Sequence, residues 1–137
     1  MELKKFIDDE FNDLIEKYSE INKTNIEDDL IHNTDILVKI VNKIKIIARE
    51  LRAVDILYGE KYKEKYAYYG HESDLVPDND LERKSMVCAD ADIIQLQKLK
   101  DVYMVDLEWL LELKEIFKKK SWDVSNVIKY REFESGK

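Results

Sequence analysis

The feature that most constrains the fold is a long stripe of apolar side chains with helical spacing between residues 25 and 69. They recur in a near-heptad pattern that predicts one helix of more than 40 residues. The stripe consists of Leu30, Thr34, Leu37, Val41, Ile44, Ala48, Leu51, Tyr58 and Tyr62. Asp55 interrupts it, and Gly59 costs about 1 kcal/mol relative to alanine inside a helix, so the helix could continue, kink or break there.

The same segment also carries apolar side chains away from this stripe, at Ile36, Ile40, Ile47, Val54 and Ile56. A helix that is apolar on more than one side must be covered by several neighbours. In a chain of only 137 residues, we expect other subunits to supply some of those neighbours.

The composition agrees with an all-α fold built from long amphipathic helices. Charged residues make up 39 % of the chain and hydrophobic residues 45 %, with three glycines and one proline. A β-sandwich or barrel would need many more turn residues. The length fits a single domain over residues 1–137.

Shorter helical signals precede and end the long helix. Apolar spacing predicts a helix over residues 2–20, and the capping-box spacing of Thr24 and Glu27 predicts that the long helix starts near residue 25. Gly70 suits a left-handed residue just past the end of that helix. We therefore expect an N-terminal helical part over residues 2–70.

A polar loop around Pro77 is expected to follow, over residues 71–89. Within it, the segment "LERKSMVC" at residues 81–88 could form either a short helix or a short extended segment.

C-terminal helices are expected over residues 90–137. Asp90 or Asp92 could cap the first of them, since acidic groups favour a helix N-terminus. Ser125 could cap a last short helix over residues 126–134.

Sequence features also indicate the compartment. Cys88 is the only cysteine, so no disulfide can form within the chain. The N-terminus is charged throughout, unlike a signal peptide, and no apolar run approaches the ~20 residues of a membrane span. We expect a soluble, intracellular protein.

Charge is strongly segregated along the chain, whose formal net charge is −7. Residues 39–65 hold 8 basic and 4 acidic groups, for a net charge of +4. The blocks on either side are acidic, with net charges of −7 over residues 1–38 and −5 over residues 66–97. An acidic total argues against diffuse affinity for nucleic acid, but one positive block permits a local anion site.

The end of that block is the candidate nucleic-acid site. Its lysines could neutralise phosphates and its tyrosines could stack on bases of a single strand. The candidate residues are Lys61, Lys63, Lys65, Tyr68 and Tyr69. Alternatively, the segment is a charged helix end in which two glutamates neutralise two of the lysines. On a straight helix Lys63 points away from the other two, so a shared site needs neighbouring subunits, or a helix that ends before Tyr66.

A second basic cluster lies at Lys118, Lys119 and Lys120. It is either a solvated helix end that complements the macrodipole or a second anion contact.

No catalytic or metal-binding pattern is present in the sequence, and we expect neither an enzyme nor a cofactor. The two histidines lie far apart, the single cysteine has no activating partners, and three glycines cannot form a phosphate-binding loop.

Three segments resemble UvsY-like recombination mediators of T-even-type bacteriophages. They are "KEKYAYYG" at 63–70, "KSMVCADADIIQLQ" at 84–97 and "VIKYREFESGK" at 127–137. The region 84–137 resembles the C-terminal part of that family without gaps, and the total length is similar. The first 50 residues resemble it only in helical pattern.

The resemblance implies a function without enzymatic activity. Members of this family bind single-stranded DNA, form rings of six or seven subunits, and contact a phage recombinase (UvsX-like) and the phage single-strand-binding protein in the cytoplasm of the infected bacterium. The basic pair associated with DNA falls on Lys63 and Lys65, ahead of Tyr68 and Tyr69, and we extend the site to Lys61. Ring contacts are expected along the C-terminal seam of Leu96, Leu99, Tyr103, Leu107, Leu110 and Phe117.

The alternative is a structural helical oligomer or adaptor that does not bind DNA. It would share the long two-sided helix.

Overall fold

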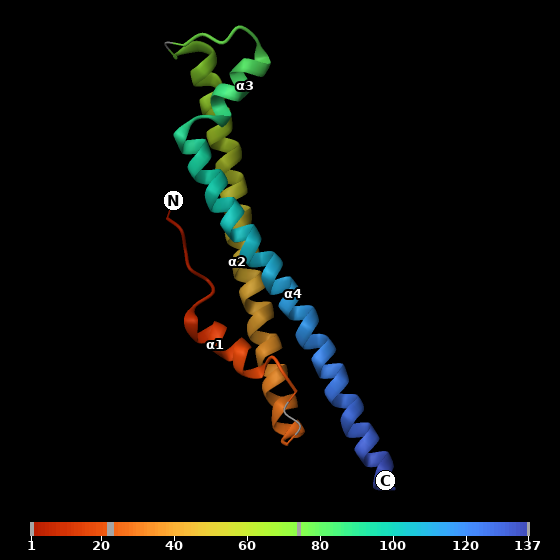
Figure 1. The fold of residues 1–137 in the computed structure, drawn as a ribbon. Helices are drawn as coiled ribbons and strands as arrows, with labels where there is room; N and C mark the ends of the chain where they lie inside the picture. The colour runs from red at the N-terminus through yellow and green to blue at the C-terminus, as the bar shows by residue number, and fades with distance from the viewer. Residues whose placement is uncertain (1, 22–23, 74, 137) are drawn as a thin grey trace. The chain divides into compact units, whose positions relative to one another are not determined.

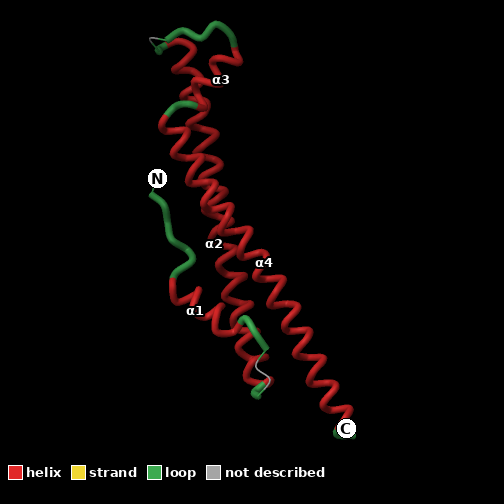
Figure 2. The backbone as a smooth tube through the Cα atoms, in the orientation of Figure 1, coloured by secondary structure: helices red, strands yellow, loops and turns green. Residues whose placement is uncertain are grey.

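The computed structural model describes residues 2–21, 24–73 and 75–136, which form four helices and contain no strand (Figures 1 and 2). In chain order they are α1 (Asp9–Tyr18), α2 (Ile26–His71), α3 (Asp80–Cys88) and α4 (Ala91–Glu134). The predicted all-α fold is confirmed. No helix among the described residues is both long and apolar enough to cross a membrane.

Helix α2 continues through Gly59 without a break. It begins where predicted, but Asn25 rather than Thr24 provides the cap, because the Asn25 Oδ1 accepts a hydrogen bond of 3.1 Å from the Asp28 backbone N–H. Gly70 is helical rather than left-handed, so that prediction was wrong. A Cβ atom at Gly70 would overlap the Arg83 guanidinium, so a larger residue there would displace the end of that side chain.

The apolar stripe predicted for α2 is not its most buried face. Its members are half-buried or exposed. The buried positions instead follow a parallel stripe at steps of three, four or seven residues: Ile26, Asp29, Asn33, Ile36, Ile40, Ile47 and Val54. Four of them, Ile36, Ile40, Ile47 and Val54, belong to the second apolar set named from the sequence, and the polar residues Asp29 and Asn33 extend that face towards the start of the helix.

The extended alternative for residues 81–88 was wrong, because this segment is the helix α3. Asn79 caps it by accepting a hydrogen bond of 2.8 Å from the Glu82 backbone N–H. The Glu82 carboxylate in turn accepts a bond of 3.0 Å from the backbone N–H of Asp78, the residue before the cap, which resembles a capping box shifted by one residue. The loop predicted over 71–89 is therefore shorter than expected.

The two terminal helices also differ from the prediction. Helix α1 starts only after Asp8, whose Oδ1 accepts a bond of 2.7 Å from the Phe11 backbone N–H and so caps it. Helix α4 passes through Ser125 into the region predicted as a separate last helix. No glycine or proline interrupts that region, so nothing ends the helix there.

The chain divides into two compact units, and α2 and α4 each contribute to both. The first unit holds residues 2–3 and 48–105 of the described chain, and the second holds residues 4–47 and 106–136 apart from 22–23. The core of the first unit is Val54, Val87, Ile93, Leu96, Leu99 and Tyr103. The core of the second unit includes Phe11, Ile15, Ile36, Ile40, Leu110, Phe117 and Val124.

Candidate nucleic-acid interface

The predicted site lies in the first unit, on the last three turns of α2. Because α2 runs to His71, the helix does not end before Tyr66, and that explanation for a shared face was wrong. Lys61 and Lys65 are four residues apart and share one side, whereas Lys63 projects from the opposite side. One protomer therefore presents the predicted cations in two directions.

Lys63 is the available cation of this segment. Its side chain is exposed, and among the described residues it forms no ion pair. Lys61, by contrast, lies 3.4 Å from the Glu64 carboxylate. Because this is an exposed pair within one helix, it holds Lys61 only weakly.

Lys65 is held by two aspartates at the start of α4. Its Nζ lies 3.0 Å from the Asp92 carboxylate and 3.4 Å from that of Asp90. The hydrogen bond with Asp92, with the charges of both aspartates, raises the pKa of the Lys65 ammonium above its ordinary value despite some desolvation. The positive charge is thus already neutralised within the unit.

Asp90 connects this ion pair to the tyrosines. The Tyr69 hydroxyl donates a hydrogen bond of 2.6 Å to the Asp90 carboxylate. Burial raises the pKa of Asp90, but the bonds from Tyr69 and the Asp92 backbone N–H, with the charge of Lys65, outweigh it and leave the pKa below its ordinary value. Asp90 also caps α4 as predicted, since its Oδ1 accepts the Asp92 backbone N–H at 2.9 Å.

The two adjacent tyrosines therefore differ in what they can do. Tyr69 is half-buried and tied to Asp90, whereas Tyr68 is 42 % exposed. Their rings meet edge to face with centroids 5.1 Å apart, and the Lys65 ammonium lies 5.9 Å from the centroid of Tyr68. Tyr68 is thus the tyrosine that could stack on a base.

Sequence reasoning missed the role of α3. Arg83 donates a hydrogen bond of 2.7 Å from Nε to the Tyr66 carbonyl, and its guanidinium lies 3.7 Å from the centre of the Tyr66 ring. The Tyr66 hydroxyl donates to the Asp80 carboxylate at the start of α3. These contacts hold α3 against the end of α2 and so position the tyrosine segment.

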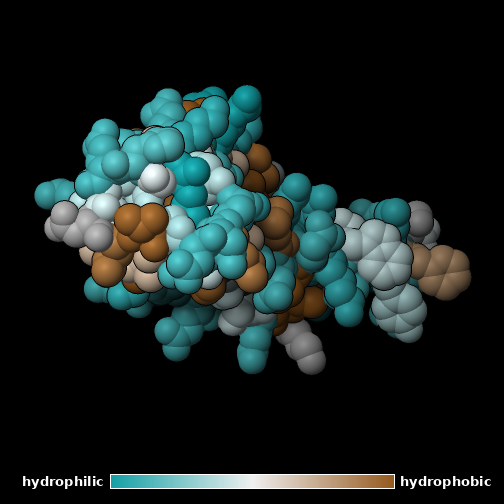
Figure 3. Space-filling view, turned by 90° about the horizontal axis from the view of Figure 1, so that it is seen from above, coloured by the Kyte–Doolittle hydropathy of each residue, from teal (hydrophilic) through white to brown (hydrophobic). Residues whose placement is uncertain are grey.

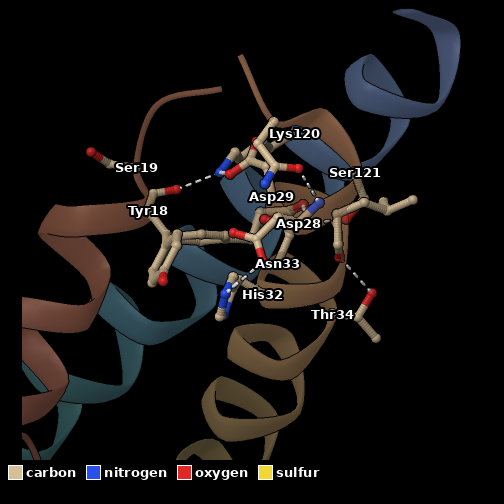
Figure 4. Close-up of polar contacts among 12 residues, drawn as sticks. Tyr18, Ser19, Asp28, Asp29, His32, Asn33, Thr34, Lys120 and Ser121 are labelled. Carbon is tan, nitrogen blue, oxygen red and sulfur yellow. Dashed lines mark hydrogen bonds and ion pairs between the residues drawn. The ribbon is translucent and has the colours of Figure 1, made fainter. Parts of the chain in front are cut away.

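The second basic cluster, in the second unit, is divided by burial. Lys119 is exposed, and Lys118 is exposed with its Nζ 3.7 Å from the Glu115 carboxylate. Lys120 is buried, and its Nζ donates bonds of 2.6 Å to the Tyr18 carbonyl and 2.9 Å to the Asp29 carboxylate (Figure 4). Lys120 thus anchors the end of α1, and only the other two lysines face solvent.

Most of the residues predicted to form ring contacts are buried within the protomer. Leu96, Leu99 and Tyr103 are buried in the first unit, and Leu110 and Phe117 in the second, while Leu107 is half-buried. Other apolar side chains of α4 face solvent, and hydrophobic patches are visible between hydrophilic side chains in Figure 3. The exposed set on α4 is Ile94, Val102, Met104, Val105, Leu111, Ile116, Trp122, Tyr130 and Phe133.

No group of three or more histidine, cysteine or acidic side chains within the described ranges could hold a metal ion. His32 stacks on Tyr18 with ring centroids 4.6 Å apart and lies 3.3 Å from the Asp28 carboxylate, which gives it a packing role.

Solved structures that match this fold belong to a class of recombination mediator proteins. They are crystal structures of the bacteriophage T4 recombination mediator protein UvsY in different lattice types. One has a TM-score of 0.79 at 17 % identity and covers 96 % of this chain and 99 % of its own. A second has a TM-score of 0.78 at 18 % identity and covers 92 % and 96 %.

The chain therefore has the fold of UvsY, as its three sequence segments led us to expect. At this level of identity the likeness concerns the fold. No protein-family model and no curated protein matches the sequence.

Proposed function

We propose that the protein is a recombination mediator that binds single-stranded DNA as a ring-forming oligomer. It would help a phage recombinase (UvsX-like) load onto DNA covered by the single-strand-binding protein, in the cytoplasm of an infected bacterium. The observation that carries the proposal is the exposed Lys63, which has no ion pair among the described residues, on a helix end that also presents Tyr68, in a fold shared with UvsY.

Binding begins with Lys63, because its charge is available to a phosphate. Lys65 joins only by exchanging the carboxylates of Asp90 and Asp92 for a phosphate, so its net contribution is small. Affinity per protomer is therefore weak. Several weak sites held in one ring bind a single strand tightly through effective concentration.

Because the cations project from opposite sides of α2, one strand is more readily bound by several protomers than by one. Lys63 and Tyr68 are five residues apart on a continuous helix and do not share a face. A strand that passes from one protomer to the next can contact Lys63 of one copy and Tyr68 of a neighbouring copy.

Loading needs no covalent step. A strand wrapped along the ring is bent into a path that the single-strand-binding protein holds less well, and the recombinase then gains the strand. The shift is limited by the difference in the affinity of the ring for the two states of the DNA. The acidic N-terminal block, with a net charge of −7 over residues 1–38, repels phosphate and suits basic protein surfaces.

Assembly through the predicted seam would compete with the core of the protomer, because most of its side chains are buried there. The exposed apolar side chains of α4 are better suited to contacts with another copy. Val105 is 64 % exposed in the first unit and Ile116 is 54 % exposed in the second. Exposed apolar surface of this kind is typical of protein interfaces.

An adaptor that does not bind DNA is the second candidate. It is favoured by the neutralisation of Lys65 by Asp90 and Asp92, to which the exposed pair between Lys61 and Glu64 adds little.

Titration of labelled oligo-dT at low salt separates the two candidates. A mediator shows saturable binding that weakens with salt. The double substitution Lys63→Ala with Lys65→Ala lowers the salt slope by about 0.7 for each phosphate that the variant no longer neutralises, without changing the native mass. The adaptor shows no saturable binding, and unchanged binding by the double variant would remove these lysines from the site.

A further inference from the structure

Gly59 occupies a position where neither conformation nor packing within the protein requires glycine. It lies inside α2, far from both ends, and its φ is not positive. Its position is exposed, and a Cβ atom added there would meet nothing within 4 Å. Since glycine is a weak helix former, its presence points to something outside the protomer that approaches the helix backbone.

The neighbours of Gly59 on the same face identify what could approach. Arg52, Ile56 and Lys63 lie seven and three residues before it and four residues after it, so all four positions share one side of α2. Both cations are exposed and form no ion pair within the described residues, and Ile56 is 56 % exposed. The helical rise places the two cations about 16 Å apart along the axis, with Gly59 between them.

We propose that the sugar–phosphate backbone of single-stranded DNA crosses α2 at Gly59, between Arg52 and Lys63. The inference rests on the proposed function and extends its site by about three turns towards the N-terminus of α2. The missing side chain at Gly59 lets the strand lie against the helix backbone, the two cations contact phosphates on either side, and Ile56 packs against sugar or base. Lys63, which shares no face with Lys61 or Lys65, thereby gains a cationic partner.

Replacing Glu60 provides a test in which DNA binding should become tighter rather than weaker. It is exposed, follows Gly59 directly, and lies three residues before Lys63 at the edge of this face, without an ion pair among the described residues. Its charge repels a phosphate that approaches Gly59. Glu60→Gln should therefore tighten DNA binding.

The experiment compares the full-length protein with single variants by titration of fluorescein-labelled oligo-dT at salt concentrations from roughly 50 to 200 mM NaCl. Arg52→Gln should lower the salt slope by about 0.7. The same rise in salt should then reduce the DNA affinity of this variant by a factor about 2.6-fold smaller than for the parent. Lys98→Gln is the matched control. Lys98 is an exposed cation on α4 in the same unit and has no ion pair within the described ranges. Its replacement should leave the salt slope unchanged.

Gly59→Ala separates stability from binding. It should raise the melting temperature by about 4 °C, because alanine is the better helix former and nothing obstructs its Cβ atom. It should nevertheless weaken DNA binding, and Gly59→Gln should weaken binding further. The higher melting temperature shows that the weaker binding does not come from misfolding.

Two outcomes would overturn the inference while the proposed function stands. In both, the parent binds oligo-dT and the Lys63→Ala/Lys65→Ala variant binds it less well. In the first, Gly59→Ala binds as tightly as the parent. In the second, Arg52→Gln behaves like Lys98→Gln. If the parent itself shows no saturable binding, the proposed function and this inference fail together.

Discussion

The buried ion pair between Lys120 and Asp29 offers the sharpest test of how the second unit is held together. Asp29 is 1 % exposed and Lys120 is 5 % exposed, and their charged atoms are 2.9 Å apart. Lys120 also donates to the carbonyl of Tyr18, the last residue of α1. Replacing Lys120 with methionine keeps most of the side-chain volume but removes the charge and both hydrogen bonds.

The expected loss in the free energy of unfolding follows from these contacts. Removing one partner of a buried pair costs about 3–5 kcal/mol, because the other charge stays buried. Asp29 lies in the first turn of α2, where the helix N-terminus stabilises a carboxylate by up to about 1 kcal/mol, so the lower end applies. The missing bond to Tyr18 adds about 1 kcal/mol. We expect Lys120→Met to lose about 4 kcal/mol in total.

A second substitution shows whether the loss comes from burying the Asp29 carboxylate without the Lys120 charge. Asp29→Leu combined with Lys120→Met removes both charges and leaves the Tyr18 carbonyl without its Lys120 donor, so the double variant should be destabilised less than Lys120→Met alone. Urea unfolding followed by circular dichroism, at one fixed protomer concentration, gives these values. A loss below about 1 kcal/mol for Lys120→Met, or a double variant as unstable as the single one, would refute the reasoning.

Three further predictions concern the first unit and the assembly. Asp92→Asn should leave Lys65 paired with Asp90 alone, and so tighten binding to oligo-dT with a steeper salt slope; weaker binding would contradict the neutralisation of Lys65. The pKa of Asp90 is lowered in the folded protein, so its stabilising effect is complete at neutral pH and lost as the pH falls below its ordinary value of 3.8. Urea midpoints should accordingly fall less from neutral pH to about pH 3 in Asp90→Asn than in the parent, and an equal fall would exclude this effect. Leu110→Asp should unfold the protein, because Leu110 is fully buried. Ile116→Asp should keep the helicity of the protein and lower its native mass, because Ile116 is exposed. The reverse pattern would indicate that the subunits contact each other through the predicted seam.

The sequence predicted the elements whose signal repeats over many turns. The apolar stripe of α2 recurs from Leu30 to Tyr62 and predicted one long helix, whereas its continuity through Gly59 was left open and comes from the structure. The nine residues of α3 contain too few apolar positions to show a period, and the helix depends on the Asn79 cap and on contacts between Arg83 and Tyr66. Those contacts join residues 17 positions apart, which a local pattern does not reveal.

The site residues show the same division. Lys63 and Tyr68 were predicted from local chemistry and are exposed, whereas the partners of Lys65 lie 25 and 27 residues further along the chain. The burial of Lys120 could have been inferred from its spacing in the sequence. Lys120 continues the stripe of Leu113, Phe117 and Val124 at three- and four-residue steps. Its position therefore indicated the core, although a charged side chain is usually exposed to solvent.

Native mass spectrometry with and without a dT oligonucleotide tests the central claim most directly. The proposed mediator should appear as one closed oligomer of several subunits, and the oligonucleotide should add its mass to that oligomer without changing the subunit number. The Lys63→Ala/Lys65→Ala variant should keep the oligomer and lose the added mass. A monomer, or an oligomer that binds no oligonucleotide at low salt, would contradict the account.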